Sequence, residues 1–142
     1  MASIAAPALP FGSRLREGAL FLGGLVLAMG LHVIDPAQVN GPVCPFLAVT
    51  GLYCPGCGTL RCLHALLHGD LRTAAGYNVL TVLLLPVIVV AWVTTGIAAL
   101  GGRPVPVIAR LPRWVGPAIV VATVTFWVLR NVPAAPFSWL AP

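Results

Sequence analysis

The chain has few ionisable side chains and no lysine. Charged residues make up 8% of the sequence, and eight arginines stand against three acidic residues, Glu17, Asp35 and Asp70. Three scattered acids cannot form a paired-carboxylate site, and there is no Ser-His-Asp set or phosphate-binding loop, which excludes hydrolase and kinase chemistry. The arginines lie at segment ends and not in a block. Nucleic acid is therefore excluded as a partner, because neutralising phosphates needs clustered cations.

Apolar residues dominate what is present. They make up 59% of the 142 residues, the mean hydropathy is +1.00, and long apolar runs cover residues 18–34, 79–100 and 115–129. A helix needs about 20 residues to cross roughly 30 Å of hydrocarbon, so the middle run is long enough and the outer two are short. We expect an all-α membrane protein with three transmembrane helices, at about residues 18–34, 79–100 and 115–132. Its first partner is the lipid bilayer.

The two ends of the sequence differ from this apolar middle. Residues 1–17 are predicted to form a disordered cytoplasmic tail, because their first part is rich in Ala and Pro and has no periodicity. Residues 18–132 then form a single membrane domain. Residues 133–142 are expected to form an interfacial tail anchored by Phe137 and Trp139, since aromatic rings favour the level of the lipid headgroups.

The first apolar run has a second interpretation, a secretory signal. Arg14 and Arg16 precede this run, and Ala28 and Gly30 are small residues at the spacing of a cleavage site. The run is 17 residues long, whereas the apolar core of a signal usually has about 7 to 15 residues. Its length favours a membrane span.

The distribution of the arginines predicts an orientation in a bacterial cytoplasmic membrane. Five arginines flank one side of the predicted spans and three flank the other, and loops rich in Arg stay in the cytoplasm. The amino terminus is therefore expected inside, with the segment between the first two spans facing outward. The inner group is Arg14, Arg16, Arg103, Arg110 and Arg113, and the outer group is Arg61, Arg72 and Arg130. Arg130 ends the third run, where its side chain can snorkel to the interface.

The segment of residues 44–78, between the first and second spans, holds all four cysteines and two of the three histidines. Leucines at helical spacing predict a short helix over 59–68, with Gly69 in the left-handed position that ends it. Asp70 suits the N-cap of a second short helix over 71–76, and Asn78 is placed to cap the second span. We expect this cysteine segment to form an interfacial or re-entrant helical hairpin.

A metal site is the first interpretation of the cysteine segment. Cys54 and Cys57 flank a Pro-Gly turn that can direct both sulfurs to one ion, for which zinc is the candidate. Two more ligands are needed, and helical geometry turns Cys62 roughly 100° away from Arg61 on its helix. We therefore favour Cys44 together with a histidine as the completion. The predicted metal ligands are Cys44, Cys54, Cys57, His64 and His68.

Two other interpretations of the cysteines stay open. A cysteine at a helix N-terminus has a stabilised thiolate, so Cys54 could attack a disulfide while Cys57 or Cys44 resolves it. Alternatively, the cysteines form a structural disulfide or act as small buried apolar side chains. The spacing of the four residues does not separate these possibilities.

The remaining polar residues of the segment have structural interpretations. Arg61 on a largely apolar helix needs a partner, and Asp70 is the nearest carboxylate in the sequence. His64 and His68 lie four residues apart, which is the spacing of helical metal pairs, but two solvated histidines share that spacing. Asn78 is predicted to act as a helix cap.

The order Cys44-Pro45, Cys54-Pro55-Gly56-Cys57-Gly58, Arg61, Gly69-Asp70 and Asn78 resembles a family of small bacterial membrane proteins. That family is known as domain of unknown function 2752 and has a CPxCGxTR signature followed by Gly-Asp and Asn-Pro. Here Leu60 replaces the threonine of the signature, and Val79 replaces the proline. The resemblance implies a polytopic membrane protein with the cysteine motif between its spans, and it implies no activity.

These observations together predict a non-catalytic role. We expect a small polytopic membrane protein whose metal-binding or disulfide-stabilised module acts through other membrane proteins. The alternative is a membrane thiol-disulfide oxidoreductase that uses Cys54 and Cys57.

Overall fold

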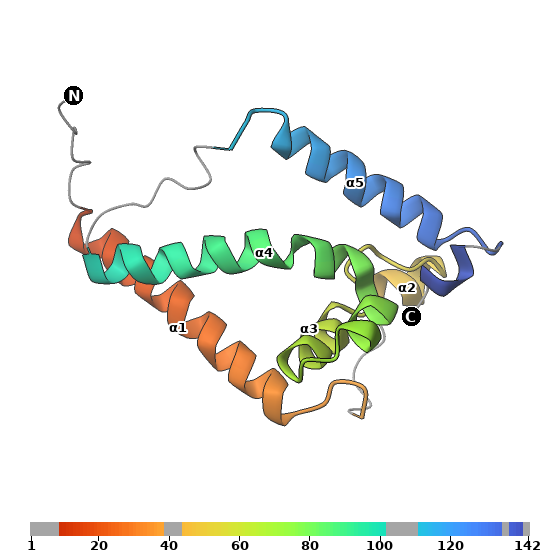
Figure 1. Cartoon of the computed structure of the whole chain (residues 1–142), viewed down its shortest axis with the longest axis horizontal. Helices are drawn as coiled ribbons and strands as arrows, with labels where there is room; N and C mark the ends of the chain where they lie inside the picture. Colours follow the sequence, from red (N-terminus) through yellow and green to blue (C-terminus); the bar gives the residue numbers. More distant parts are fainter. Residues whose placement is uncertain (1–8, 39–43, 102–110, 135–136, 141–142) are drawn as a thin grey trace. The chain divides into compact units, whose positions relative to one another are not determined.

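The computed structural model describes residues 9–38, 44–101, 111–134 and 137–140, and throughout these residues the regular structure is helical. This confirms the all-α fold class, with the cysteines between the first and second long helices (Figure 1). The elements are α1 (Phe11–Val33), α2 (Pro45–Thr50), α3 (Thr59–Leu67), α4 (Leu71–Gly101), α5 (Val115–Arg130) and the 3-10 turn η2 (Phe137–Leu140).

Among the residues that the structure describes, two helices are long and apolar enough to cross a membrane. They are α1, with 23 residues, and α4, with 31 residues, while α5 is apolar but shorter, with 16 residues. Only 6% of the apolar window of α1 and 11% of that of α4 are buried in the protein. Exposed apolar surface of this extent is unstable in water and stable against lipid, so these helices have the character of membrane spans and not of a soluble core.

The amino-terminal prediction needs a correction. Helix α1 begins at Phe11, so residues 11–17, which the sequence assigns to a disordered tail, form its first two turns. The side chain of Arg14 donates hydrogen bonds to the carbonyls of Ala99, at 3.2 Å, and Leu100, at 3.4 Å. These carbonyls lie at the end of α4, where a cation is favoured by the helix dipole. Residues 1–8 lie outside the described residues.

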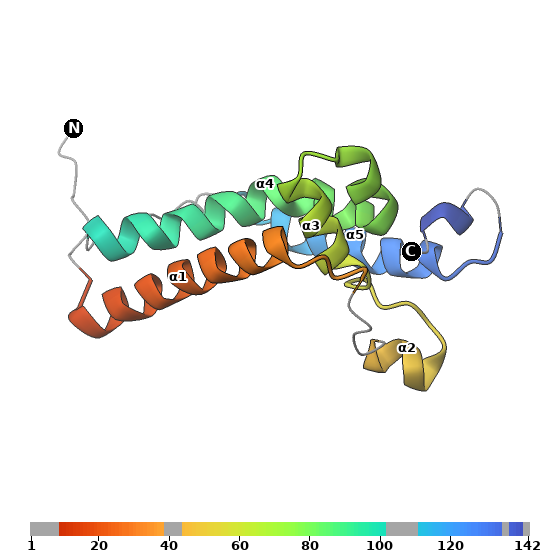
Figure 2. The ribbon, with the colours of Figure 1, turned by 90° about the horizontal axis from the view of Figure 1, so that it is seen from below.

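The chain divides into two compact units, and both α1 and α4 contribute to each of them. The first unit contains residues 1–29 and 86–111. Within it, the first part of α1 and the last part of α4 run antiparallel as a helix pair (Figure 2). Phe21 stacks on Trp92 with 4.8 Å between ring centroids, and Trp92 Nε1 donates to the Phe21 carbonyl at 3.2 Å.

Glycines allow this close approach of the helix pair. A Cβ at Gly96 would lie 2.8 Å from the ring of Phe21, and a Cβ at Gly24 would overlap the indole of Trp92. A Cβ at the neighbouring Gly23 would have no other atom within 4 Å. Small residues at such contacts let two membrane helices pack their backbones and large rings together.

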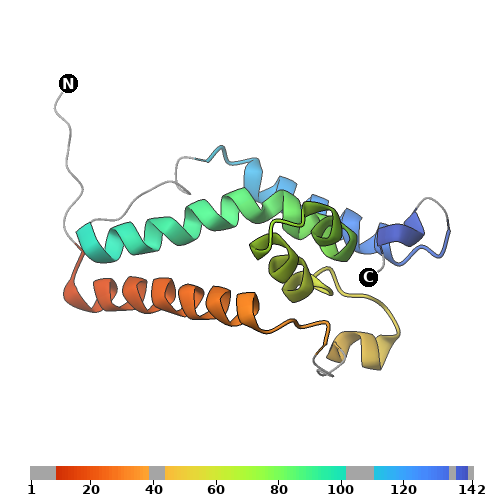
Figure 3. The same cartoon turned by 60° about the horizontal axis from the view of Figure 1, so that its bottom comes forward.

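The second unit contains residues 30–85 and 112–142. In it, α3 and the first turns of α4 form the predicted helical hairpin (Figure 3). Gly69 adopts a φ of 76° after α3, as expected, and Asp70 accepts a hydrogen bond from the Thr73 N–H at 3.0 Å at the start of α4. The hairpin is closed by a small core of Cys62, Ala65 and Ala74.

Helix α4 is broken at Asn78. This residue has an extended backbone, with φ −163° and ψ 94°, between the short helix that starts at Leu71 and the long apolar helix that follows. The Asn78 Oδ1 accepts the Thr81 N–H at 3.0 Å, so Asn78 caps the apolar helix as the sequence predicts. The break separates the hairpin from the span and frees the Asn78 carboxamide for other contacts.

Candidate metal centre

A tight turn brings Cys54 and Cys57 together at the start of α3. The Cys57 N–H donates to the Cys54 carbonyl at 3.1 Å, and the Thr59 N–H donates to the Gly56 carbonyl at 3.1 Å. Gly58, the N-cap of α3, has a φ of 81°, which other residues rarely adopt. The turn that precedes α3 therefore depends on Gly58 and presents both sulfurs on one side.

Cys44 joins this pair from the start of α2. This six-residue helix, which the sequence analysis missed, begins with Pro45 and places Cys44 at its N-cap. The Sγ atoms of Cys54 and Cys57 lie 3.0 Å apart, and those of Cys44 and Cys54 lie 3.6 Å apart. All three sulfurs lie within 4.8 Å of one another, and each belongs to a free cysteine.

The three thiols have different surroundings. Burial raises the pKa of Cys57 to about 12, with a further contribution from its contact with Cys54. The backbone N–H of Leu47, followed by the Cys54 thiol, holds the pKa of Cys44 below its usual range. The Cys54 N–H donates to the Cys57 sulfur at 3.3 Å, a contact that favours a thiolate at Cys57.

Two asparagines hold the loop that carries Cys54 and Cys57. The Asn78 carboxamide donates to the carbonyls of Pro55, at 2.9 Å, and Cys57, at 3.2 Å. On the other side, Asn131 accepts the Tyr53 N–H at 2.8 Å and donates to the Tyr53 carbonyl at 2.9 Å. Four polar backbone groups of the loop are thus paired with side chains from distant parts of the chain, which helps to fix the position of the sulfurs.

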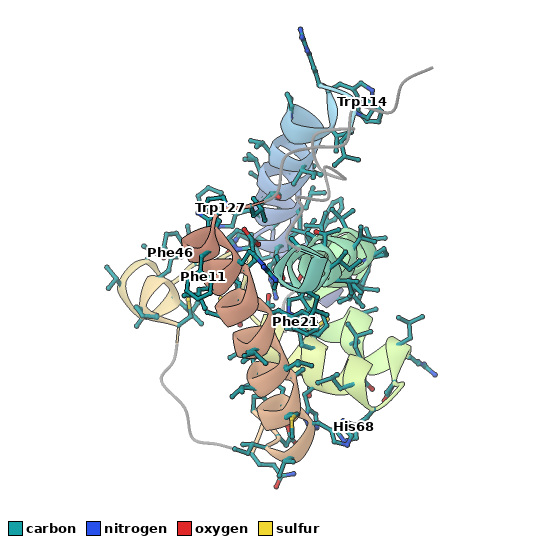
Figure 4. The ribbon with its side chains drawn as sticks, turned by 90° about the vertical axis from the view of Figure 1, so that its left-hand side faces the viewer. Phe11, Phe21, Phe46, His68, Trp114 and Trp127 are labelled. Atoms are coloured by element: carbon teal, nitrogen blue, oxygen red, sulfur yellow. The ribbon has the colours of Figure 1, made fainter. Side chains whose placement is uncertain are left out.

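The carboxyl end of α5 covers the same loop. Phe46, in α2, packs edge-on against Trp127 of α5, with 6.0 Å between ring centroids (Figure 4). Arg130 is only 2% exposed and donates to the Tyr77 carbonyl at 3.2 Å. The expectation that Arg130 snorkels to the interface is therefore wrong, because protein groups surround its guanidinium.

The two candidate histidine ligands lie elsewhere. His64 Nδ1 contacts the Leu31 carbonyl, and its Nε2 lies 4.0 Å from Asp35 Oδ1. His68 stacks on His32 with 4.5 Å between ring centroids, and its Nδ1 contacts the His64 carbonyl at 2.9 Å. In Figure 4, His68 lies well apart from Phe46 and Trp127. The structure thus brings Cys44, Cys54 and Cys57 together, and it gathers the histidines in a separate cluster with Asp35.

The other polar residues of the segment are also placed. Arg61 is exposed, and the described residues include no ion pair between it and Asp70. Hydrogen bonds from Thr73 instead hold the pKa of Asp70 below its usual range. Cys62 is fully buried, and its thiol contacts the Asn78 carbonyl at 3.5 Å. Cys62 therefore points away from the other sulfurs, as helical geometry predicts.

Sequence reasoning missed the contribution of α5 to the site. Asn131, Arg130 and Trp127 come from the end of an apolar run that carries no motif. The one available signal was an Arg-Asn pair directly after that run, since two adjacent polar residues at the end of a span need partners. The spacing of the cysteines says nothing about a helix that lies more than 50 residues further along the chain.

Comparison with known proteins identifies one family. Residues 44–92 match the family described as a protein of unknown function, DUF2752. This confirms the resemblance carried by the CPxCG motif, and the matched segment contains Cys44, Cys54, Cys57 and Asn78 but ends before Arg130. No curated protein and no solved structure matches the chain.

Proposed function

We propose that Cys44, Cys54 and Cys57 hold one metal ion of the zinc class, and that this ion stabilises a module of a membrane protein. The observation that carries the proposal is the convergence of three free cysteine sulfurs within 4.8 Å of one another. They come from two separate segments, which meet in the fold although ten residues separate Cys44 from Cys54.

The sulfur separations support a shared ion. Zinc binds thiolates at about 2.3 Å in tetrahedral geometry, which sets neighbouring sulfurs roughly 3.8 Å apart. The separation of Cys44 and Cys54, 3.6 Å, is close to this value, and that of Cys54 and Cys57, 3.0 Å, is shorter. The three sulfurs lie within 4.8 Å of one another, so every separation is within about 1 Å of the value that a shared zinc ion requires.

The surroundings of Cys57 favour a metal-bound thiolate over a free one. Burial raises its pKa to about 12, so the uncompensated thiolate is unstable at neutral pH. A bound divalent cation supplies the missing positive charge and displaces the proton.

Three protein ligands leave a fourth position at the ion. Every cysteine, histidine and side-chain carboxylate of the sequence lies within the described residues, and only the three sulfurs meet at this site. A water molecule or a group from another membrane protein is suited to the fourth position. We place the module in a bacterial cytoplasmic membrane with the cysteine segment outward and assign it a non-catalytic role in binding membrane partners.

A second candidate function is thiol-disulfide exchange. It is favoured by the position of the Cys54 sulfur, which contacts both Cys57 and Cys44. Forming the Cys54–Cys57 disulfide would create one S–S bond and transfer two electrons and two protons to an acceptor such as a quinone. Substituting the resolving cysteine would then trap a mixed disulfide with a thiol partner, and failure to recover one contradicts this function.

Metal analysis of the purified chain in detergent tests the first proposal. We expect about one zinc or similar ion per chain, and almost none in Cys57→Ser, because the substitution removes a ligand. Mass spectrometry with and without reductant should find the four cysteines unoxidised. Folded, metal-free protein with a Cys54–Cys57 disulfide would overturn the metal proposal in favour of the second function.

Cys62→Ala provides a matched control. Its sulfur is buried but lies outside the cluster, so this variant should keep its ion. Loss of the ion from both Cys62→Ala and Cys57→Ser would show that metal content follows general folding and not ligation.

A further inference from the structure

Arg130 is a buried cation whose hydrogen-bonding groups are mostly unpaired. It is 2% exposed, and one nitrogen, Nη2, donates to the Tyr77 carbonyl. Its Nε and Nη1 are buried and have no hydrogen-bond partner. A buried charge without a counter-charge is strongly destabilising, so its retention requires an anion nearby.

No side-chain carboxylate supplies that anion. The sequence has three acidic residues, all within the described residues, and each is engaged elsewhere. Glu17 pairs with Arg16 at 3.1 Å, Asp35 faces His64 at 4.0 Å, and Asp70 caps α4. The counter-charge of Arg130 must therefore come from another kind of group.

Aromatic rings contribute only part of the stabilisation. The guanidinium carbon lies 5.2 Å from the centroid of the Phe126 ring and 5.8 Å from that of Tyr53. Cation–π contacts at these distances attract the guanidinium, but they leave its N–H groups unpaired. An external anion is also disfavoured, because the unpaired nitrogens have no exposed surface through which a ligand could reach them.

Thiolates are a further source of negative charge, and the loop that carries Cys54 and Cys57 lies against Arg130. Tyr77, whose carbonyl accepts from Arg130, is followed by Asn78, which donates to the Cys57 carbonyl. The ring of Tyr53, the residue before Cys54, lies against the guanidinium, and Arg130 is followed by Asn131, which binds the Tyr53 backbone. Arg130 is thus held against the loop that carries Cys54 and Cys57, where thiolates would supply the missing negative charge.

We propose that Arg130 is the counter-ion of the metal centre and that the centre carries one net negative charge, as three thiolates on one divalent cation do. This inference rests on the proposed metal site and specifies its charge. Three thiolates and a divalent ion sum to −1, which Arg130 neutralises, so that the buried assembly is neutral. A disulfide or protonated thiols would leave the guanidinium unpaired.

The charge assignment is tested by Zn²⁺ affinity of the full chain in detergent, measured by competition with a chelator. Arg130→Met, which keeps the length of the side chain but not its charge, should weaken Zn²⁺ binding about tenfold or more. Arg130→Lys retains the charge and should stay closer to wild type.

The melting temperatures of wild type and Arg130→Met, with and without Zn²⁺, give a second measurement. Without metal, Arg130→Met should be at least as stable as wild type, because an unpaired buried charge has been removed. With Zn²⁺, wild type should gain more in melting temperature than Arg130→Met. The lost contact with Tyr77 affects both conditions alike and cancels in this comparison.

The outcomes separate the two proposals. If wild type binds no Zn²⁺, the metal site itself is wrong. If wild type and Arg130→Met bind Zn²⁺ equally, or if Arg130→Lys weakens binding as much as Arg130→Met, the metal site stands and the counter-ion role of Arg130 is overturned.

Discussion

The helix pair of the first unit and the cysteine segment of the second are stabilised in different ways. The helix pair uses stacked rings over glycines, and most of its apolar side chains are exposed. The buried polar side chains among the described residues, Asn78, Thr81 and Arg130, all belong to the second unit. Lipid can solvate the apolar pair, whereas the cysteine segment depends on pairing specific polar groups. Damage to one region should therefore leave the other largely intact.

The largest expected effect is that of removing the Asn78 carboxamide, which should destabilise the cysteine segment and leave the helix pair intact. Asn78→Ala leaves the carbonyls of Pro55 and Cys57 and the N–H of Thr81 without their partner in a buried site. We expect the cysteine segment to lose about 3 kcal/mol of stability. The measurement is the rate at which a maleimide labels the buried Cys62, followed by mass spectrometry.

Asn78→Asp separates the two roles of this side chain. It keeps an oxygen that can cap the helix through Thr81 but loses the donor to the Cys57 carbonyl. This variant should also expose Cys62, since the donated bonds hold the loop. Labelling of Cys62 at the wild-type rate in both variants would show that the Asn78 side chain does not hold the loop of Cys54 and Cys57.

Adjacent glycines in α1 provide an intermediate test on the helix pair. Gly24→Ala places a methyl group against the indole of Trp92, and overpacking of this kind costs about 2 kcal/mol. Gly23→Ala meets open space and should be neutral or slightly stabilising, because alanine favours the helix. Thermal unfolding in detergent compares the two variants. Equal stability of the pair would contradict close packing at Gly24, and the metal content of each should match wild type.

The smallest expected effect is the pH dependence of the Asp70 cap. Bonds from the side chain and backbone of Thr73 lower the pKa of Asp70 from 3.8, so its contribution to stability is present above the unfolded value. That contribution is lost as pH falls through the folded pKa. Asp70→Ser keeps a capping oxygen that does not titrate in this range.

We expect wild type to lose slightly more melting temperature than Asp70→Ser when the pH is lowered from about 6 to about 3. Titrating groups other than Asp70 are shared by the two proteins, so the difference reports this carboxylate. A larger loss in Asp70→Ser would contradict the sign of the effect.

Local signals in the sequence predicted the local features of the fold. The short helix ending at Gly69, the cap at Asp70 and the cap at Asn78 all follow from rules that operate within a few residues. The orientation of Cys62 away from the cluster followed from helical geometry. Apolar length alone located the two candidate spans.

Long-range contacts could not be predicted in the same way. The bonds of Asn131 to Tyr53, and the burial of Arg130, depend on how α5 packs in the second unit, which no sequence period encodes. Helix α1 starts earlier than its apolar run, and Arg14 in its first turns donates to carbonyls at the end of α4. In each case a polar residue at the end of an apolar run is paired with a group far along the chain.

The double hydrogen bond between Asn131 and Tyr53 has a consequence for biosynthesis. Asn131 is translated 78 residues after Tyr53, and Arg130 directly precedes it. The loop that carries Cys54 and Cys57 therefore leaves the ribosome long before its clamp and its neighbouring cation exist. Its thiols pass through a period in which they are less shielded and less constrained than in the finished fold, since contacts of such sequence separation form only when both partners are present. The synthesis and packing of α5 are thus the steps that complete the cysteine site.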